Sequence, residues 1–369
     1  MQEITIGMVG FGSIAKTHCI AAANIAANTE IPIKIGKIYR RNQEAPLPFF
    51  VTDYADSMET LIEESDVIDI CSSNDAHFEQ AKQVLEAGKS LYLEKPVGIN
   101  MEQANALLQL VKERPVKNQV ALMYRFMPAV VAIRDLAAAG DIGDIIDFRC
   151  QVQHSGYLDP NRKSNWKLKK EMSGGGPLLD IGIHIADMIR FTLGEVTDVK
   201  CSTKTVSGKR LDQVTGNWVD VDVEDWAWAR MYLDNDISGT VEITRVASVL
   251  DQSSVFSVYG TKGSLHFCAS APARVKMYHQ NDAVQSLGEV SPMSDFGRHL
   301  ASIYPKMSLG WMADAHAASQ LHFYQQIGGG SLKYAETPDI EEAVKSQLVI
   351  DACYRSAEAG GSKIRVIRE

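Results

Sequence analysis

The sequence lacks the features that would place it in a membrane or in a disulfide-rich class of protein. None of its apolar runs approaches the roughly 20 residues that a transmembrane helix needs. Its six cysteines are scattered, with no CxxC pair and no regular spacing, which argues against a disulfide framework and a zinc site. A signal peptide would carry positive charge where Glu3 stands. We therefore expect a cytoplasmic protein with free thiols.

An excess of basic residues is also lacking. The 369 residues include 37 Lys and Arg against 46 Asp and Glu, which gives a formal charge of −9. Nucleic-acid binding needs clustered cations, so this balance argues against a nucleic-acid partner. With 45% hydrophobic and 22% charged residues, the composition is that of a globular protein, and its length favours two domains.

A glycine turn lies at the first junction between a strand and a helix. The apolar run ITIGMVGFG precedes a helical pattern, and the junction has the spacing G-x-G-x-x-A. Gly10 can make a tight turn, Gly12 lets backbone approach a pyrophosphate, and the small Ala15 lets the helix pack on the strand. The helix N-terminus offers free N–H groups to phosphates. The alternative is a tight turn without a ligand. The predicted dinucleotide contacts are Gly10, Phe11, Gly12, Ser13 and Ile14.

Short apolar strands and longer helical patterns alternate through the first third. We expect strands at 31–39, 66–74, 90–96 and 116–124, and helices at 76–88 and 101–113. This alternation predicts a parallel, doubly wound α/β sheet, in which ligands lie beyond the C-terminal strand ends. Those ends are Gly10–Gly12, Arg40–Arg41, Ser72–Asn74, Glu94–Pro96 and Tyr124–Arg125.

The end of the second strand indicates the cofactor. NAD-binding proteins usually place an acidic residue there, which hydrogen-bonds the ribose 2′-hydroxyl. This chain has Arg40 and Arg41 instead, and guanidinium groups can clamp a 2′-phosphate. NADP is therefore favoured over NAD. The alternative is a pair of solvated surface arginines.

The second half changes to strands with a period of two. From about Asp144 the sequence runs through IIDFRCQVQ, DWAWARMYL, ISGTVEITR, SSVFSVYG and GSLHF, with a turn at Asn235-Asp236. DWAWARMYL is apolar on both faces, and helices can cover only one of them. We expect the other face to form a homodimer or homotetramer interface.

An apolar helix, expected to start near Pro177 after SGGG, carries polar groups at helical spacing. Asp180, His184 and Asp187 fall at i, i+4 and i+7 and so share one stripe, and Gly182 lies mid-helix at a cost of about 1 kcal/mol. The stripe has three interpretations: the wet side of an amphipathic helix, a metal site, or the wall of a cofactor cleft. No other cluster with ligand spacing supplies further metal ligands, and we expect no metal.

Several motifs resemble one family in the right order over nearly the whole chain. They are G-x-G-x-x-A, Asn74 and His77 before a helix, AGKSLYLEKP, YRFMP, SGGGPLLDIGIHIAD, VEDWAWARMYLDNDISGTVEIT, VYGTKGSLHF and AVKSQLVIDACYRSAEAG. Together they look like the glucose–fructose oxidoreductase, inositol dehydrogenase and MocA (Gfo/Idh/MocA) family. The combination of Glu94-Lys95-Pro96 with Asp180 and His184 is specific, whereas each alone is not.

The resemblance implies a fold, a division of the chain into two domains, and an activity. A Rossmann domain at 1–123 would precede an α+β domain at 124–369, built on a large open-faced, mostly antiparallel sheet. The enzyme would oxidise or reduce sugars, polyols or inositol-like compounds with NAD(P). Arg40 departs from the acidic residue of NAD-using relatives, and residues 269–318 match no motif.

The resemblance also favours the cofactor cleft for the Asp180 stripe. His184 would move the hydroxyl proton, because imidazole titrates near neutrality. Lys95 would stabilise the developing alkoxide, with Pro96 aiming it from a bond that is cis in the family. Asp180 would accept a substrate hydroxyl. Without the resemblance, Lys95 is read as a surface lysine.

The remaining predicted contacts divide between cofactor and substrate. The cofactor set consists of the glycine-turn residues, Arg40 and Arg41, together with Ser72, Asn74, His77, Glu94, Lys95 and Arg125. Arg125 has an alternative as an ion pair between domains. The substrate set is Lys95, Tyr157, Trp166, Asp180 and His184. Two rival functions stay open: a non-catalytic dinucleotide-binding regulator, and a metal-dependent hydrolase or lyase using Asp180 and His184.

Overall fold

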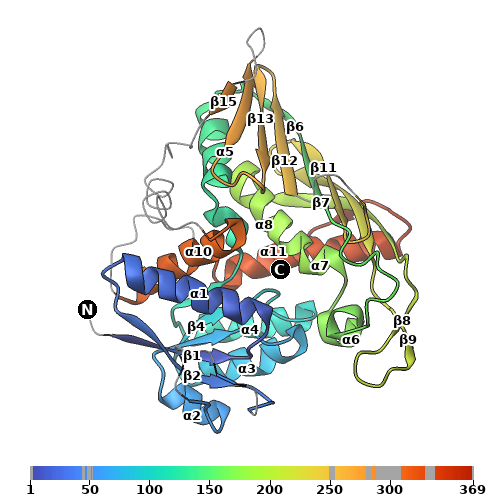
Figure 1. The fold of residues 1–369 in the computed structure, drawn as a ribbon. Coiled ribbons are helices and arrows are strands. Elements are labelled where there is room, and N and C mark those ends of the chain that lie inside the picture. Colours follow the sequence, from blue (N-terminus) through green and yellow to red (C-terminus); the bar gives the residue numbers. More distant parts are fainter. Residues whose placement is uncertain are drawn as a thin grey trace. The chain divides into compact units, whose positions relative to one another are not determined.

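The computed structural model describes residues 3–43, 46–47, 51, 53–248, 254–279, 285–287, 309–328 and 337–367. The chain divides into two compact units. The first unit comprises Met1–Phe126 and Ser302–Val344, and the second comprises Met127–Ala301 and Lys345–Glu369. Figure 1 labels the elements of each unit.

The first unit contains the predicted parallel sheet. Its strands are β1 (Ile4–Val9), β2 (Ile33–Tyr39), β3 (Val67–Ile70), β4 (Ser90–Leu93) and β5 (Asn118–Val120). Their order is β2-β1-β3-β4-β5, and all pairs are parallel. Strand β3 is buried at every position, as expected for a sheet covered on both faces. The doubly wound prediction is therefore confirmed.

The helices of the first unit cover this sheet. They are α1 (Ser13–Asn28), α2 (Met58–Glu63), α3 (Asn74–Glu86), α4 (Met101–Glu113), the 3₁₀ helix η1 (Met123–Phe126) and α10 (Trp311–Ile327). Side chains of α1 and α10 share one core cluster with β1 and β2. Ser57 and Asn100 cap α2 and α4 by accepting backbone N–H groups. The sequence analysis did not predict α2, which has only six residues.

The second unit is built on a mixed sheet of nine strands. Its order is β15-β14-β13-β12-β6-β11-β10-β7-β16. The bounds are β6 (Ile145–Gln153), β7 (Val196–Lys204), β10 (Trp226–Leu233), β11 (Ser238–Thr244), β12 (Ser254–Gly260), β13 (Gly263–Cys268), β14 (Val275–His279), β15 (Gln285–Leu287) and β16 (Ile364–Arg365). Only β6 and β11 pair in parallel among these strands, so the expected mostly antiparallel sheet is confirmed.

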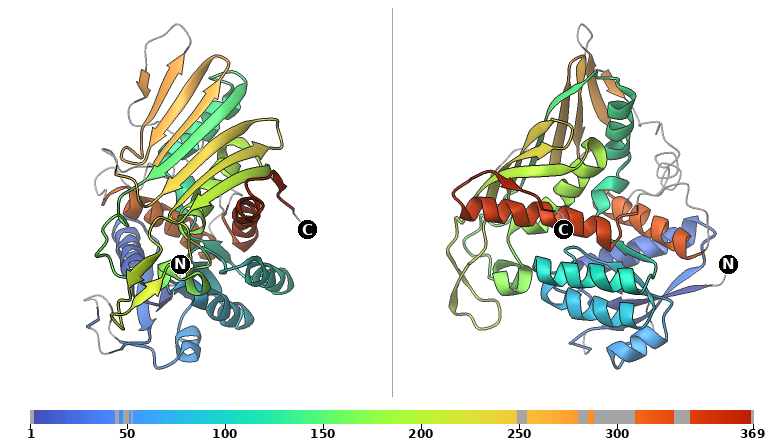
Figure 2. Two further views of the ribbon diagram at one scale, coloured as in Figure 1. Left: turned by 90° about the vertical axis from the view of Figure 1, so that its right-hand side faces the viewer. Right: turned by 180° about the vertical axis from the view of Figure 1, so that it is seen from behind.

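Helices cover one face of this sheet. They are α5 (Pro128–Ala139), α8 (Gly182–Leu193) and the second-unit part of α11 (Ile340–Glu358), and no helix of the described chain covers the other face (Figure 2). Alternation in β6 fits this, because Phe148 and Cys150 are buried whereas Arg149 is exposed. Trp228 of β10, on the open face, is 40% exposed.

Each unit is built from two separate segments of the chain. Helix α10 belongs to the first unit, although it follows the sheet of the second in sequence. A small hairpin of β8 (Lys209–Leu211) and β9 (Trp218–Asp220) extends the second unit. Within the range 269–318 that matched no motif, residues 280–284 and 288–308 lie outside the described part. None of the helices in the described part of the chain has the length and apolar character that crossing a membrane requires.

The two glycines of the first turn predict different costs of substitution. Gly10 has φ of +82°, and a Cβ there would lie 2.9 Å from the carbonyl oxygen of Cys71. Gly10→Ala should therefore lower the free energy of unfolding by about 1–3 kcal/mol, measured by urea titration. Gly12→Ala is the matched control, because its Cβ would meet nothing within 4 Å. Equal losses in both variants would contradict the strain at Gly10.

Candidate active site

The turn between β1 and α1 leaves room for a phosphate group. Helix α1 starts at Ser13, and its N-cap residue Gly12 supplies no side-chain hydrogen bond to the first N–H groups. The space beside the Cα of Gly12 is open, whereas Ala15 is fully buried against the sheet. Free N–H groups, open space and a close helix–strand contact are what a pyrophosphate requires. These residues therefore fit a dinucleotide.

The end of β2 presents two arginines. Strand β2 ends at Tyr39; Arg40 follows it half-buried and Arg41 is exposed. The next residues, Asn42 and Gln43, carry no charge. No carboxylate between Tyr39 and Gln43 can accept a hydrogen bond from a ribose 2′-hydroxyl, whereas Arg40 and Arg41 can donate to a 2′-phosphate.

His77 joins the ends of β3 and β4. Its Nδ1 lies 2.8 Å from the carbonyl oxygen of Pro96 and its Nε2 lies 3.3 Å from that of Ser72. Burial lowers the pKa of His77, so the ring is neutral and donates its one N–H, at the shorter distance, to Pro96. The Lys95-Pro96 bond is cis, as the resemblance implied. Asn74 begins α3 nearby and is buried.

A buried array of charged groups supports the end of β4. His18 of α1 places Nδ1 2.9 Å from Oδ2 of Asp69 and Nε2 3.1 Å from Oε1 of Glu94. Burial alone would lower the pKa of His18, but the charge of Asp69 and the hydrogen bonds of His18 to Asp69 and Cys71 raise it well above the usual value. Burial would raise the pKa of Glu94, but the bond and charge of His18 lower it to about 2.

This array was not predicted from the sequence, although one signal was present. Asp69 is the only charged residue inside the apolar strand β3, and it is 1% exposed. A buried carboxylate needs a cation or a set of donors, and His18 supplies one. His18, Glu94 and His316 also offer ligand atoms close enough for a metal ion, as do His18, Asp69 and Cys71. His18 belongs to both groups, and carboxylate oxygens already accept hydrogen bonds at both of its ring nitrogens.

Arg125 of η1 is buried and forms an ion pair within the first unit. Its Nη2 lies 3.8 Å from Oε2 of Glu342 in α11. Both residues belong to the first unit, which extends to Val344, and both fall within the predicted domain 124–369, so this pair is not the predicted ion pair between domains. The contact of Arg125 with cofactor stays a prediction.

The single helix predicted from Pro177 is wrong, because it is two helices. Helix α7 (Pro177–Asp180) ends at Asp180, and α8 starts at Gly182 after Ile181. Gly182 is thus the first residue of α8, where a Cβ would lie 3.1 Å from Ile243. The close packing of Gly182 on the sheet accounts for the glycine. It does not lie in the middle of a helix, so the expected loss of helix stability does not arise.

The break also separates the three residues of the predicted stripe. Asp187 is fully buried in α8, where it accepts a hydrogen bond from Ser346 at 3.4 Å. It is therefore not part of a polar stripe with Asp180. His184 lies in the first turn of α8 and is 7% exposed, while the side chain of Asp180 is 35% exposed. Of the three residues, only Asp180 and His184 lie within one helical turn of the break at Ile181.

Lys167 accompanies Asp180 and was not predicted. Its Nζ lies 3.2 Å from Oδ2 of Asp180 and 5.5 Å from the ring centre of Trp166, in the 3₁₀ helix η2 (Trp166–Leu168). Asp180 thus carries an ammonium partner that could donate to the same substrate hydroxyl. Trp166 is half-buried beside this pair, and its place in the substrate set stays a prediction.

Tyr157 lies between two guanidinium groups. Those of Arg162 and Arg245 are 3.9 Å and 4.4 Å from its ring centre, and its backbone oxygen accepts from the buried Arg210. The side chain is 8% exposed. These contacts fix the loop, and the predicted contact of Tyr157 with substrate stays a prediction.

Glu224 anchors the glycine turn before α7. Its carboxylate accepts hydrogen bonds from the backbone N–H of Gly176 at 3.0 Å and of Leu178 at 2.8 Å, and from the hydroxyl of Tyr354 at 3.1 Å. A Cβ at Gly176 would lie only 2.1 Å from the backbone oxygen of Glu224. Glycine lets this carboxylate approach the turn that carries Asp180. The short helix α6 (Lys170–Ser173) leads into the same turn.

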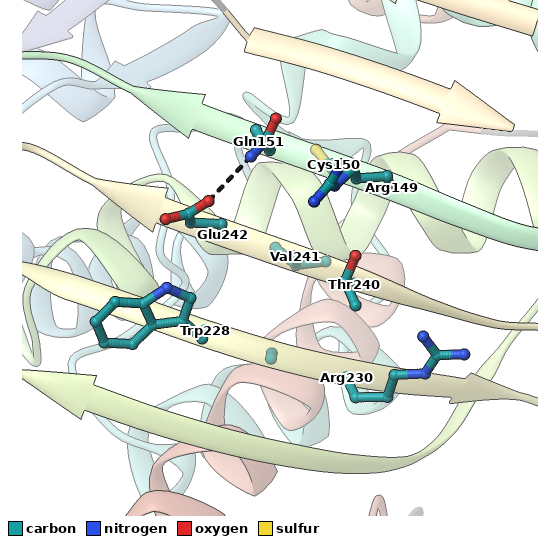
Figure 3. Close-up of a pocket in the computed structure, with 9 residues that line it drawn as sticks. Arg149, Cys150, Gln151, Trp228, Arg230, Thr240, Val241 and Glu242 are labelled. Carbon is teal, nitrogen blue, oxygen red and sulfur yellow. Dashed lines mark hydrogen bonds between the residues drawn. The ribbon is translucent and has the colours of Figure 1, made fainter. Parts of the chain in front are cut away.

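A shallow pocket lies on the open face of the nine-stranded sheet. It has a volume of about 320 Å³, and Figure 3 shows Trp228, Arg230 and Glu242 on this face. Gln151 donates to Glu242 at 3.0 Å. None of the predicted cofactor or substrate residues lines it.

Removing the Glu224 carboxylate should destabilise the protein. Glu224→Ala leaves two backbone N–H groups and the Tyr354 hydroxyl without this acceptor, and we expect a loss of about 2–4 kcal/mol in the free energy of unfolding. Urea titration measures it, with the exposed Glu171→Ala as control. Glu224→Gln keeps one acceptor oxygen and should lose less. An Ala variant as stable as the control would contradict the anchoring role.

Comparisons with known proteins agree with this geometry. A family model described as "Oxidoreductase family, NAD-binding Rossmann fold" matches residues 4–122, and one described as "GFO/IDH/MocA C-terminal domain" matches 130–266. Levoglucosan dehydrogenase of Pseudarthrobacter phenanthrenivorans is 28% identical, over 97% of each chain. Glucose-6-phosphate 3-dehydrogenase of Bacillus subtilis is 24% identical, over 94% of each.

Solved structures show the same similarity. Levoglucosan dehydrogenase in complex with NADH and levoglucosan has a TM-score of 0.89 and 26% identity, and the match covers 100% of both chains. The two family models together account for more than half of this chain, in the order that the motifs indicated. The chain therefore belongs to the GFO/IDH/MocA family of oxidoreductases, with an NAD-binding Rossmann fold in its first part.

Proposed function

We propose that the protein is an NAD(P)-dependent dehydrogenase that prefers NADP and acts on a carbinol carbon of a sugar, polyol or inositol-like substrate. The observation that carries the proposal is the end of β4, where buried hydrogen bonds hold Glu94 and Pro96 on either side of Lys95. A lysine on the surface needs no such support. The named dehydrogenases among the relatives support the same class of reaction.

A bound nicotinamide would supply the hydride acceptor or donor. Lys95 holds the substrate hydroxyl and stabilises negative charge on its oxygen. His184 takes the hydroxyl proton in oxidation and returns it in reduction. Asp180 accepts a hydrogen bond from a neighbouring hydroxyl, and Lys167 keeps its carboxylate in place. Tyr157 and Trp166 complete the proposed substrate set.

The cofactor preference rests on Arg40 and Arg41. Levoglucosan dehydrogenase, a relative, has been solved in complex with NADH. The two arginines after β2 favour the additional phosphate of NADP, and Gly10, Phe11, Gly12, Ser13 and Ile14 are the proposed pyrophosphate contacts. Ser72, Asn74, His77, Glu94, Lys95 and Arg125 complete the proposed cofactor set. We further propose that residues 1–123 form the dinucleotide-binding domain and residues 124–369 the substrate-binding and oligomerisation domain, with Lys95 and Arg125 reaching across this division. The proposed location is the cytoplasm, where the six free thiols persist.

Turnover and cofactor binding together test this function. We expect NADP to be reduced with at least one of levoglucosan, glucose 6-phosphate or inositol, followed by nicotinamide absorbance. Lys95→Met and His184→Ala should each lower kcat by about 100-fold or more, because each loses a group acting on the hydroxyl. Both should still bind NADP in a thermal-shift assay.

A cofactor control separates the alternatives. Arg40→Asp should reverse the preference from NADP to NAD. Arg114→Asp should leave it unchanged, because Arg114 is an exposed arginine at the C-terminal end of α4 and is not in the proposed cofactor set. Cofactor binding without turnover on this panel would favour a dinucleotide-binding regulator. Turnover that disappears after chelation would favour a metal-dependent reaction.

We also propose that the open face of the nine-stranded sheet forms a homodimer or homotetramer interface. Trp226 and Trp228 stack on this face with ring centres 5.2 Å apart. Tyr259, which pairs with Asp147 on this face, is also exposed, at 37%. Stacked indoles that would otherwise face water favour burial against a second copy.

Size-exclusion chromatography with light scattering tests the interface. The protein should elute at two or four times the mass of one chain at micromolar concentration. Trp228→Glu should shift it toward the monomer, because the interface would bury an unpaired charge. Trp218→Glu, on the β8–β9 hairpin and 65% exposed, is the matched control. A wild-type monomer would exclude the proposal.

A further inference from the structure

His18 lies at the centre of the first unit's buried charges. Its Nδ1 is 2.9 Å and 3.0 Å from the two carboxylate oxygens of Asp69, and its Nε2 is 3.1 Å from Glu94. A neutral imidazole carries one N–H and one lone pair. With carboxylates at both nitrogens, a lone pair would face an anionic oxygen on one side. Only the imidazolium satisfies both contacts.

Glu94 links the ring of His18 to the backbone of Lys95. One carboxylate oxygen of Glu94, Oε1, accepts from His18, and the other, Oε2, accepts the backbone N–H of Lys95 at 3.2 Å. Glu94 is 5% exposed, and a rotation of its carboxylate would break one of these bonds. We propose that His18 is a positioning residue, whose protonated ring holds Glu94 and thereby fixes the backbone from which Lys95 projects. This inference rests on the proposed function only for the role of Lys95.

The groups around the ring keep a single positive charge there. Asp69 is also approached by Nε2 of Gln320 at 3.3 Å, and the ring edge meets Tyr92 with centroids 5.4 Å apart. His316 of α10 lies 4.9 Å from His18 between ring centres. Burial and the charge of His18 lower the pKa of His316 to about 3, so it adds no second charge.

Cys71 and Lys95 also face the array, as do Cys19 and Tyr324, whose pKa values burial raises. The thiol of Cys71 lies 3.2 Å from Nδ1 of His18, and burial raises its pKa, so it stays neutral. Lys95 contributes a positive charge that helps to lower the pKa of Glu94. Glu94 therefore faces two cations, His18 and Lys95, which favour its ionised form.

The sign of the pH effect follows from the raised pKa of His18. A folded pKa above the unfolded value of about 6.5 stabilises the folded state fully below that pH. The stabilisation is lost as the pH rises through the folded value. Protonated His18 should thus persist above pH 7, where an ordinary histidine is neutral.

Nuclear magnetic resonance of the protein without cofactor tests the protonation directly. We expect one of the nine histidines, assigned by its loss in His18→Gln, to show imidazolium ¹⁵N shifts at pH 8. In Asp69→Asn the same ring should become neutral at that pH. A neutral ring in the wild type at pH 8 would overturn the proposal, whether or not any activity is found.

Kinetics test the positioning role on the panel substrate that is turned over. His18→Gln should lower kcat by about 10–100-fold, because a misplacement of about 1 Å costs this much, with the NADP dissociation constant changed less than about 3-fold. Adding His18→Gln to Glu94→Gln should cause less than about a 2-fold further loss, since both act through one carboxylate.

His322→Gln provides the matched control. His322 is 1% exposed on α10 and its Nε2 bonds Thr337 at 3.0 Å, away from Glu94. It should lower the melting temperature and leave kcat unchanged. Losses from His18→Gln and Glu94→Gln that multiply, or an unchanged kcat in His18→Gln, would overturn the positioning role. An imidazolium signal without dinucleotide turnover would instead remove the proposed function.

Discussion

A protonated imidazole between two carboxylates fixes the end of β4, from which Lys95 projects. Burying three charged groups costs several kcal/mol unless each is paired and hydrogen-bonded. The array meets that condition, because His18 donates to Asp69 and Glu94 and Glu94 also accepts the backbone N–H of Lys95. Such an arrangement contributes little net stability, and its main effect is to define one geometry at the strand end.

The second unit uses a buried carboxylate for a similar purpose. Glu224 holds the backbone N–H groups of Gly176 and Leu178, and α7 then leads directly to Asp180. In both units the side chain proposed to touch substrate is partly exposed, while the group that orients it is buried. A rigid backbone support of this kind preorganises a site before a ligand arrives.

Local patterns were sufficient to predict the first sheet and the glycine turn. Strand–helix alternation and turn chemistry act over a few residues, so β1 to β4 and α3 and α4 appear close to where the sequence indicates them. The return of α10 to the first unit has no local signal, because it depends on packing against α1, about 300 residues earlier. The pairing of His18 with Asp69 and Glu94 depends on the same long-range packing.

The candidate site was predictable in its residue types and less so in its geometry. Helical periodicity placed Asp180, His184 and Asp187 on one stripe, but a new helix starts at Gly182, which packs closely on β11, and Asp187 is buried. Lys167 was missed because its link to Asp180 arises from a 3₁₀ turn rather than from regular spacing. Glu224 was missed because a carboxylate in a β-rich stretch gives no sign that it caps a distant turn.

Isotope transfer tests the central claim most directly. The protein is incubated with NADP and a panel sugar carrying deuterium at each carbinol carbon, and the recovered nicotinamide cofactor is analysed by mass spectrometry. We predict one deuterium on the reduced nicotinamide ring, since the hydride moves directly between the carbons. Product formation with an unlabelled cofactor, or bound cofactor that is never reduced, would contradict the proposed hydride transfer.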